Sequence, residues 1–173
     1  MSKRAGEFIT LDELLAEVGV DAARWFFASR AATTEIDFDI ELAKKQSSEN
    51  PVYYVQYAHA RIASILRKAT EAGLQPASSV VGTLGDGPEA ALAREVVRLP
   101  EVVEDAVIAE ETHGITAYAT QLATAFHAFY RDARVVDPDD PERSASRLAL
   151  ARATQVTLAN TLALLGISAP ESM

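Results

Sequence analysis

The segment between Asn50 and Gly73 constrains the fold of this chain most, because its residues keep helical spacing over about six turns. Asn50 followed by Pro51 is a typical helix start, and Gly73 is typical of the position after a helix end. The sequence therefore predicts a helix over residues 51–72. Its apolar residues recur at spacings of three and four, and they are Val55, Ala58, Ile62, Ile65, Leu66 and Ala69. A helix with one long apolar side has to bury it against other elements.

Start and stop signals predict further helices on both sides of this segment. Thr10 and Glu13 form a capping box ahead of a first helix, which Gly19 ends. Asp21 is the expected cap of a second helix, over residues 22–30. A further helix is predicted over residues 89–98, and the next one begins at Pro100. Gly114 interrupts that helix, and a longer one follows it and ends near Arg131. The last predicted helix covers residues 142–165 and ends at Gly166.

Two segments depart from helical spacing. Between residues 35 and 41, the apolar residues Ile36, Phe38 and Ile40 alternate with acidic ones, which predicts an extended connector that packs these three side chains onto the helices. Residues 75–88 are rich in Gly, Ser and Pro and predict a loop. The predicted fold class is an all-α helical bundle with a short N-terminal connector segment.

Composition excludes several classes of function. The chain has 173 residues and no cysteine, which rules out disulfides, cysteine zinc sites and thiol nucleophiles. No signal peptide or apolar run of membrane-spanning length is present, so a soluble cytoplasmic protein without a membrane partner is expected. The net charge of −9 argues against a protein that binds DNA or RNA indiscriminately.

A second row of residues follows the predicted helix 51–72 beside the apolar one. It runs through Tyr54, Tyr57, Arg61, Ser64 and Lys68, again at spacings of three and four. Tyrosine rings can stack on bases, and arginine and lysine can neutralise phosphates, so the row suits a single-stranded RNA loop. The alternative is that both tyrosines line the edge of the core, with solvated cations beside them.

A similar but weaker cluster ends the predicted helix that follows Gly114. It consists of Tyr130, Arg131 and Arg134. Basic residues there also compensate the helix dipole, which is a sufficient structural explanation.

The three histidines, His59, His113 and His127, lack the spacing of metal ligands. We expect no metal site from them. For His59, we expect a hydrogen-bonded side chain beside the tyrosine row.

Four stretches of the chain resemble one family. Residues 1–6, MSKRAG, resemble the latter part of the KMSKS-type signature of class I aminoacyl-tRNA synthetases. Residues 21–24, DAAR, resemble the DALR motif of an anticodon-binding domain, with Ala23 in place of leucine. Residues 50–61 resemble the corresponding helix of arginyl-tRNA synthetases, and residues 164–173 resemble the C-terminus of that family. The resemblance covers essentially the whole chain, in order.

This resemblance implies the C-terminal portion of an arginyl-tRNA synthetase. The whole enzyme would use ATP to attach arginine to arginine tRNA, and its catalytic Rossmann domain would precede this chain. Residues 1–49 would be the end of the catalytic domain and a junction segment, and residues 50–173 would be the helical bundle of the DALR anticodon-binding type. The chain alone is expected to be inactive and not to bind ATP stably.

The resemblance also implies roles for individual residues. Lys3 would be catalytic and contact the ATP phosphates, although Glu7 stands where an asparagine is common after this motif. The positions that contact the anticodon would be Tyr54, Tyr57, Tyr130 and the C-terminal Met173. Spacing and charge add four cations to this RNA-binding set, namely Arg61, Lys68, Arg131 and Arg134.

Near the DAAR motif, three side chains are expected to serve the junction. Arg24 would pair with a carboxylate, while Trp25 and Phe27 would bury apolar area.

A different class of function is also compatible with the composition. The chain could be a helical protein–protein interaction module without RNA binding, because tyrosine and arginine are common at protein interfaces. Salt separates the two hypotheses, since phosphate contacts make affinity fall steeply with ionic strength.

Overall fold

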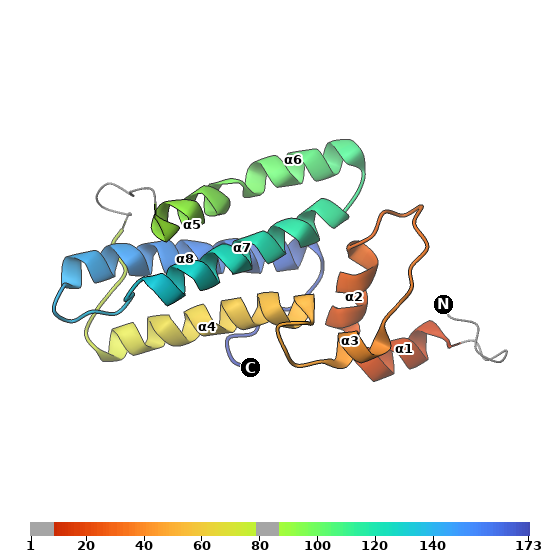
Figure 1. Cartoon of the computed structure of the whole chain (residues 1–173), viewed down its shortest axis with the longest axis horizontal. Helices are drawn as coiled ribbons and strands as arrows, with labels where there is room; N and C mark the ends of the chain where they lie inside the picture. The colour runs from red at the N-terminus through yellow and green to blue at the C-terminus, as the bar shows by residue number, and fades with distance from the viewer. Residues whose placement is uncertain (1–8, 79–86) are drawn as a thin grey trace.

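Helices joined by turns and connectors make up the part of the protein that the computed structural model describes, residues 9–78 and 87–173 (Figure 1). No strand occurs in these two ranges, and the predicted all-α fold is confirmed. The predicted loop over residues 75–88 lies partly outside the described residues. The helices are α1 (Leu11–Val18), α2 (Val20–Ala28), α3 (Ile40–Lys44), α4 (Pro51–Glu71), α5 (Pro88–Val97), α6 (Leu99–Ala109), α7 (His113–Asp132) and α8 (Pro141–Leu164).

Three long helices form the centre of the bundle. Helix α4 packs against both α7 and α8, and α5 and α6 lie against α7 on the side away from α4 (Figure 1). The apolar row predicted on α4 faces this centre, where Val55 and Ile62 are fully buried. Phe126 of α7 and Leu158 of α8 are also fully buried. The apolar side chains of the three helices therefore share one core.

The N-terminal helices α1–α3 cluster at one end of the bundle, and α2 contacts α4 and α7 (Figure 1). Trp25 is 2% exposed and belongs to the common core, as expected of a side chain that buries apolar area. For Phe27 the same expectation overestimates the buried area. Its ring lies 5.7 Å from that of Phe38, but 42% of the residue is exposed. The connector before α3 half-buries Ile36 and Phe38, as the alternating pattern predicted, but the predicted extension over Ile40 is wrong because α3 begins there.

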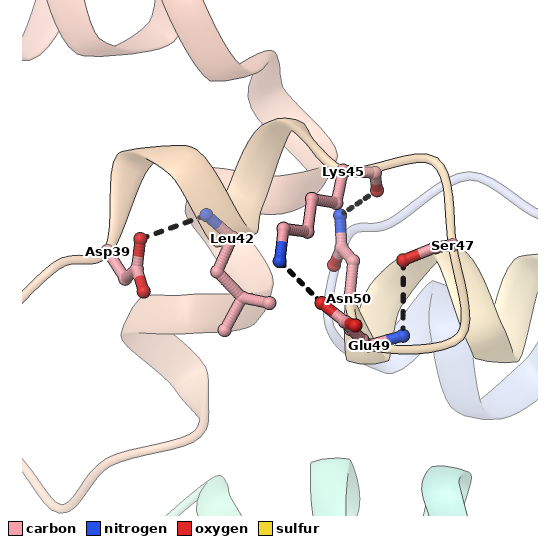
Figure 2. A network of polar contacts seen from close by, with 6 residues as sticks. All are labelled: Asp39, Leu42, Lys45, Ser47, Glu49 and Asn50. Atoms are coloured by element: carbon pink, nitrogen blue, oxygen red, sulfur yellow. Dashed lines mark hydrogen bonds and ion pairs between the residues drawn. The ribbon is translucent and has the colours of Figure 1, made fainter.

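The turn between α3 and α4 is held by polar side chains (Figure 2). Asp39 caps α3 by accepting a hydrogen bond of 2.9 Å from the backbone of Leu42. Asn50 occupies the predicted N-cap position of α4, but its side chain does not cap that helix. Its Nδ2 instead donates to the carbonyl oxygens of Ala43 and Lys45, at 2.9 Å each. The buried Asn50 side chain therefore ties α4 to the preceding turn.

Two of the other predicted caps have to be corrected. The capping box of Thr10 and Glu13 is present as predicted. Helix α2 begins at Val20 with Gly19 as its N-cap, so Asp21 lies inside the first turn and does not cap it. Gly114 does not separate α6 from α7. Helix α6 ends at Ala109, its C-cap Glu110 has the left-handed φ of 54°, and Gly114 lies inside α7.

The glycines predicted to end α4 and α8 do so. Gly73 has a φ of 75° and Gly166 a φ of 66°. In this left-handed conformation the chain turns back, and the backbone N–H of Ile167 donates to the carbonyl of Leu162 at 2.9 Å. The turn at Gly166 directs the last residues of the chain back onto the bundle.

Candidate nucleic-acid interface

The tyrosine row of α4 faces α7, and the two helices form a mixed aromatic cluster. The Tyr54 hydroxyl donates to the hydroxyl of Thr124 at 3.3 Å. The ring centroid of Tyr54 lies 4.8 Å from that of His127, and the ring of Tyr57 lies 6.1 Å from it at an interplanar angle of 25°. Tyr54 is half-buried and Tyr57 is 38% exposed. The predicted row is therefore part core edge and part open surface.

Arg61 extends this cluster by contacting Tyr130. Its guanidinium donates to the Tyr130 hydroxyl at 3.1 Å and lies 4.9 Å from the centroid of the same ring. Tyr130 in turn stacks on Phe126, with centroids 6.0 Å apart. Because these contacts hold Arg61 in place, its positive charge has a defined position at the aromatic cluster.

A hollow of about 300 Å³ opens at this cluster. It is lined by Ser48, Tyr53, Tyr54, Tyr57 and His127. The rings of Tyr53 and Tyr57 are nearly parallel, with centroids 6.4 Å apart and an interplanar angle of 11°. Flat aromatic walls and few polar groups suit an unstacked nucleobase, which needs surfaces on which to stack.

His127 is the residue of this site that sequence reasoning missed. It is half-buried, and its Nε2 is buried without a hydrogen-bond partner in the described part of the chain. Burial, and to a smaller extent the nearby Arg61, lower the pKa of His127 below its ordinary value. The available signal was its spacing on α7, where Thr124, His127 and Tyr130 follow one another at intervals of three.

Unlike Arg61, the other predicted cations form no hydrogen bond or cation–π contact with the aromatic cluster in the described part of the chain. Lys68 lies on the exposed side of α4, two turns beyond Arg61. Arg131 forms an ion pair with Asp132 at 2.8 Å, and Arg134 forms one with a carboxylate oxygen of Asp137 at 3.1 Å. Both arginines are exposed, but neighbouring carboxylates offset their charge.

The opposite side of α4 is covered by the C-terminal segment, residues 167–173. Gln56 donates to the carbonyl of Ser168 at 3.0 Å, and Nδ1 of His59 donates to the carbonyl of Pro170 at 2.8 Å. His59 is thus hydrogen-bonded, as expected, but its expected place beside the tyrosine row is wrong. It projects about 160° around the helix from Tyr57 and is 5% exposed.

Two residues of the DAAR motif form hydrogen bonds with the end of α8 and this C-terminal segment. Asp21 accepts hydrogen bonds from Gln56, at 2.8 Å, and from the backbone N–H of Ser168, at 3.2 Å. Arg24 donates to the carbonyl of Gly166, so the expected partner carboxylate is wrong and the partner is a backbone oxygen. Met173, at the end of the segment, is 54% exposed.

Two other predictions concern regions beyond this site. Lys3 lies outside the described residues. Within the described ranges, no helix is both long enough and apolar enough to cross a membrane.

Comparison with known proteins identifies relatives over the whole chain. The model of the DALR anticodon binding domain matches residues 55–173. Arginine–tRNA ligases from Dehalococcoides mccartyi and Bacillus subtilis are 50% and 48% identical to the chain, which aligns over its full length with 31% of each. The solved structure of Thermus thermophilus arginyl-tRNA synthetase has a TM-score of 0.74 and 30% identity, covering 99% of this chain and 29% of that one. The chain thus spans about a third of the length of these relatives.

Proposed function

The chain belongs to the family of DALR anticodon-binding domains, in the form found in arginine–tRNA ligases, and on that premise we propose that it binds the anticodon loop of arginine tRNA. The observation that carries the proposal is the aromatic hollow between α4 and α7, with Arg61 held beside it. Tyr57 offers a stacking surface to an unpaired base, and Arg61 offers a positive charge to the adjoining phosphate.

The charge distribution supports this assignment despite the acidity of the whole chain. Between Tyr54 and Lys68 the sequence has three cations and no carboxylate, and two of these cations, Arg61 and Lys68, belong to the tyrosine row, whereas the third, Arg67, contacts the C-terminal segment. The exposed carboxylates of Glu101, Glu104 and Asp105 lie on α6, on the side of α7 away from α4. A phosphate backbone that approaches the tyrosine row therefore meets locally positive surface.

The whole enzyme's activity is also part of the proposal. A ligase containing this chain would use ATP to attach arginine to arginine tRNA in the cytoplasm, and Lys3 would contact the ATP phosphates as a catalytic residue. Residues 1–49 would form the end of the catalytic domain and the junction, and residues 50–173 the RNA-binding bundle. Arg131, Arg134 and Met173 would belong to the outer part of the RNA contact, together with Lys68.

The alternative, a protein-interaction module without RNA binding, is not favoured, because the matching family model is an anticodon-binding domain. Salt dependence still provides an independent check. Binding through phosphates requires the affinity for tRNA to fall steeply between low and physiological salt, with a slope that increases with the number of phosphates contacted.

The decisive experiment titrates the full chain with arginine tRNA and with a noncognate tRNA. Tyr57→Ala is expected to weaken arginine tRNA binding by roughly 1–3 kcal/mol, because the stacking surface is lost. Phe27→Ala is the matched control, since Phe27 is similarly exposed, at 42%, and its ring also lies against another ring, that of Phe38. Its affinity should stay unchanged. Wild-type affinity in both Tyr54→Ala and Tyr57→Ala would refute stacking at this site.

A further inference from the structure

His127 occupies the inner wall of the aromatic hollow, where it is enclosed by rings. The ring of Tyr54 lies 4.8 Å away, that of Phe126 lies 5.5 Å away, and that of Tyr57 lies 6.1 Å away at an interplanar angle of 25°. Of these rings, Tyr57 is the exposed one. The imidazole is therefore the nitrogen-bearing ring of a hollow whose other large side chains are tyrosines.

The Nε2 atom of His127 has no hydrogen-bond partner in the described part of the chain, although it is buried. A buried polar atom without a partner destabilises the folded protein, and such atoms are rare in native structures. A phenylalanine at this position would fill similar space without that cost. Among residues 9–78 and 87–173 this nitrogen has no partner, so a bound ligand can supply one.

The electrostatic surroundings favour the uncharged form of this imidazole. Burial and the Arg61 guanidinium both disfavour the protonated ring and lower its pKa. A neutral imidazole has one nitrogen that donates a hydrogen bond and one that accepts. It can therefore match the donor and acceptor pattern on the edge of a base, whereas the tyrosine faces stack on any base.

We propose that His127 reads the edge of one unstacked base of the bound RNA loop, through a hydrogen bond at Nε2, and thereby contributes base specificity. This inference rests on the proposed function, since the ligand is the same tRNA loop. Nε2 becomes accessible when the exposed Tyr57 ring turns outward and stacks on the incoming base. Tyr57 then supplies affinity for any base, and His127 supplies the choice between bases.

The test replaces His127 by Phe and by Gln in the full chain. Affinities are measured for arginine tRNA and for a set of its single-base variants in the anticodon loop. In the wild type, changing the base that is read lowers affinity. In His127→Phe, arginine tRNA itself should bind about tenfold more weakly, and this base change should have no further effect, because one hydrogen bond is already lost. His127→Gln, which keeps a donor and an acceptor, should recover part of the discrimination.

Thermal unfolding separates this role from a purely structural one. His127→Phe removes the unpaired buried nitrogen, so its melting temperature should equal or exceed that of the wild type while its RNA discrimination falls. A lower melting temperature with unchanged discrimination would show that His127 only supports the fold.

The possible failures are distinguishable. If Tyr57→Ala weakens binding but His127→Phe discriminates every loop variant as the wild type does, this inference is wrong and the proposed function stands. If the wild-type chain does not prefer arginine tRNA over the noncognate tRNA, the proposed function fails and this inference fails with it.

Discussion

Two histidines lie on opposite sides of α4 and differ in the hydrogen bonding of their ring nitrogens. His59 is 5% exposed, and its Nδ1 donates to the carbonyl of Pro170 in the C-terminal segment. His127 reaches the other side of α4 from α7, and its Nε2 has no partner within the described ranges. The chain thus satisfies the polar groups on one side of α4 with its own C-terminal segment. On the other side it leaves an aromatic hollow with an unpaired polar atom.

This difference separates stabilising polar residues from residues available to a ligand. On the covered side, hydrogen bonds from Gln56 and His59 join α4 to the segment after Gly166. On the open side, the contacts of Tyr54 and Arg61 lie within the aromatic cluster and leave Tyr57 exposed. Changes on the covered side should therefore alter stability, and changes on the open side should mainly alter binding.

The largest stability effect is expected from loosening the covering segment itself. Ile167 is 4% exposed and belongs to the common core. Ile167→Ala should lower the free energy of unfolding by about 2–5 kcal/mol, because it leaves a cavity beneath the segment. Chemical denaturation measures this. The control is Met173→Ala, at the 54% exposed end of the same segment, which should change stability little. Equal effects of the two substitutions would mean that the segment is not anchored at Ile167.

A smaller effect is expected where the DAAR motif holds the segment. Asp21→Asn weakens the hydrogen bonds from Gln56 and Ser168 and should cost roughly 1–3 kcal/mol of unfolding free energy. Asp105→Asn, on the exposed side of α6, is the matched control and should stay within about 0.5 kcal/mol of the wild type. Hydrogen exchange of the backbone amides of residues 167–169, 171 and 172 should speed up in the first variant only. Unchanged exchange there would contradict the role of Asp21.

The open side should respond differently to a substitution of comparable size. Tyr57→Ala removes a ring that is 38% exposed, so the free energy of unfolding should change by no more than about 0.5 kcal/mol. The same variant is the one expected to lose RNA affinity. A loss of stability as large as that of Ile167→Ala would place Tyr57 in the core and abolish the distinction between the two sides of α4.

The smallest effect concerns the pH dependence of stability. The pKa of His127 in the folded protein lies below its ordinary value of 6.5, owing first to burial and then to Arg61. The unfolded chain therefore binds this proton more readily, and stability is lost as the pH falls from about 6.5 through the lower folded pKa. Above pH 6.5 the contribution of His127 is fully present. Melting temperatures of the wild type and His127→Phe, measured between pH 8 and pH 5, should diverge in this window. Parallel curves would show that His127 is not perturbed.

Much of the fold was predictable because helix signals are local. The capping box of Thr10 and Glu13, the stop at Gly73 and the apolar row on α4 depend on residues within a few positions of one another. The short helix α3 and the start of α2 were not predicted. At α2 the predicted cap, Asp21, lies inside the first turn of a helix that begins at Val20, and the ends of a helix are less sharply defined than its interior.

The candidate site was predictable only where it lies on one helix. The spacing of Tyr54, Tyr57 and Arg61 already places them on one side of α4. His127 was missed because its significance depends on the packing of α7 against α4. Arg24 was assigned the wrong partner for the same reason, since Gly166 follows it by 142 positions.

The sequence by itself determined the helices, the tyrosine row and the family resemblance, because each depends on residue types at short and regular intervals. Tertiary structure alone decided which side of α4 the C-terminal segment covers. It alone placed at the aromatic hollow the imidazole of His127, whose Nε2 has no partner among the described residues. The physical reason is that a buried polar atom is satisfied or left unpaired by neighbours from other helices, and local spacing contains no information about them.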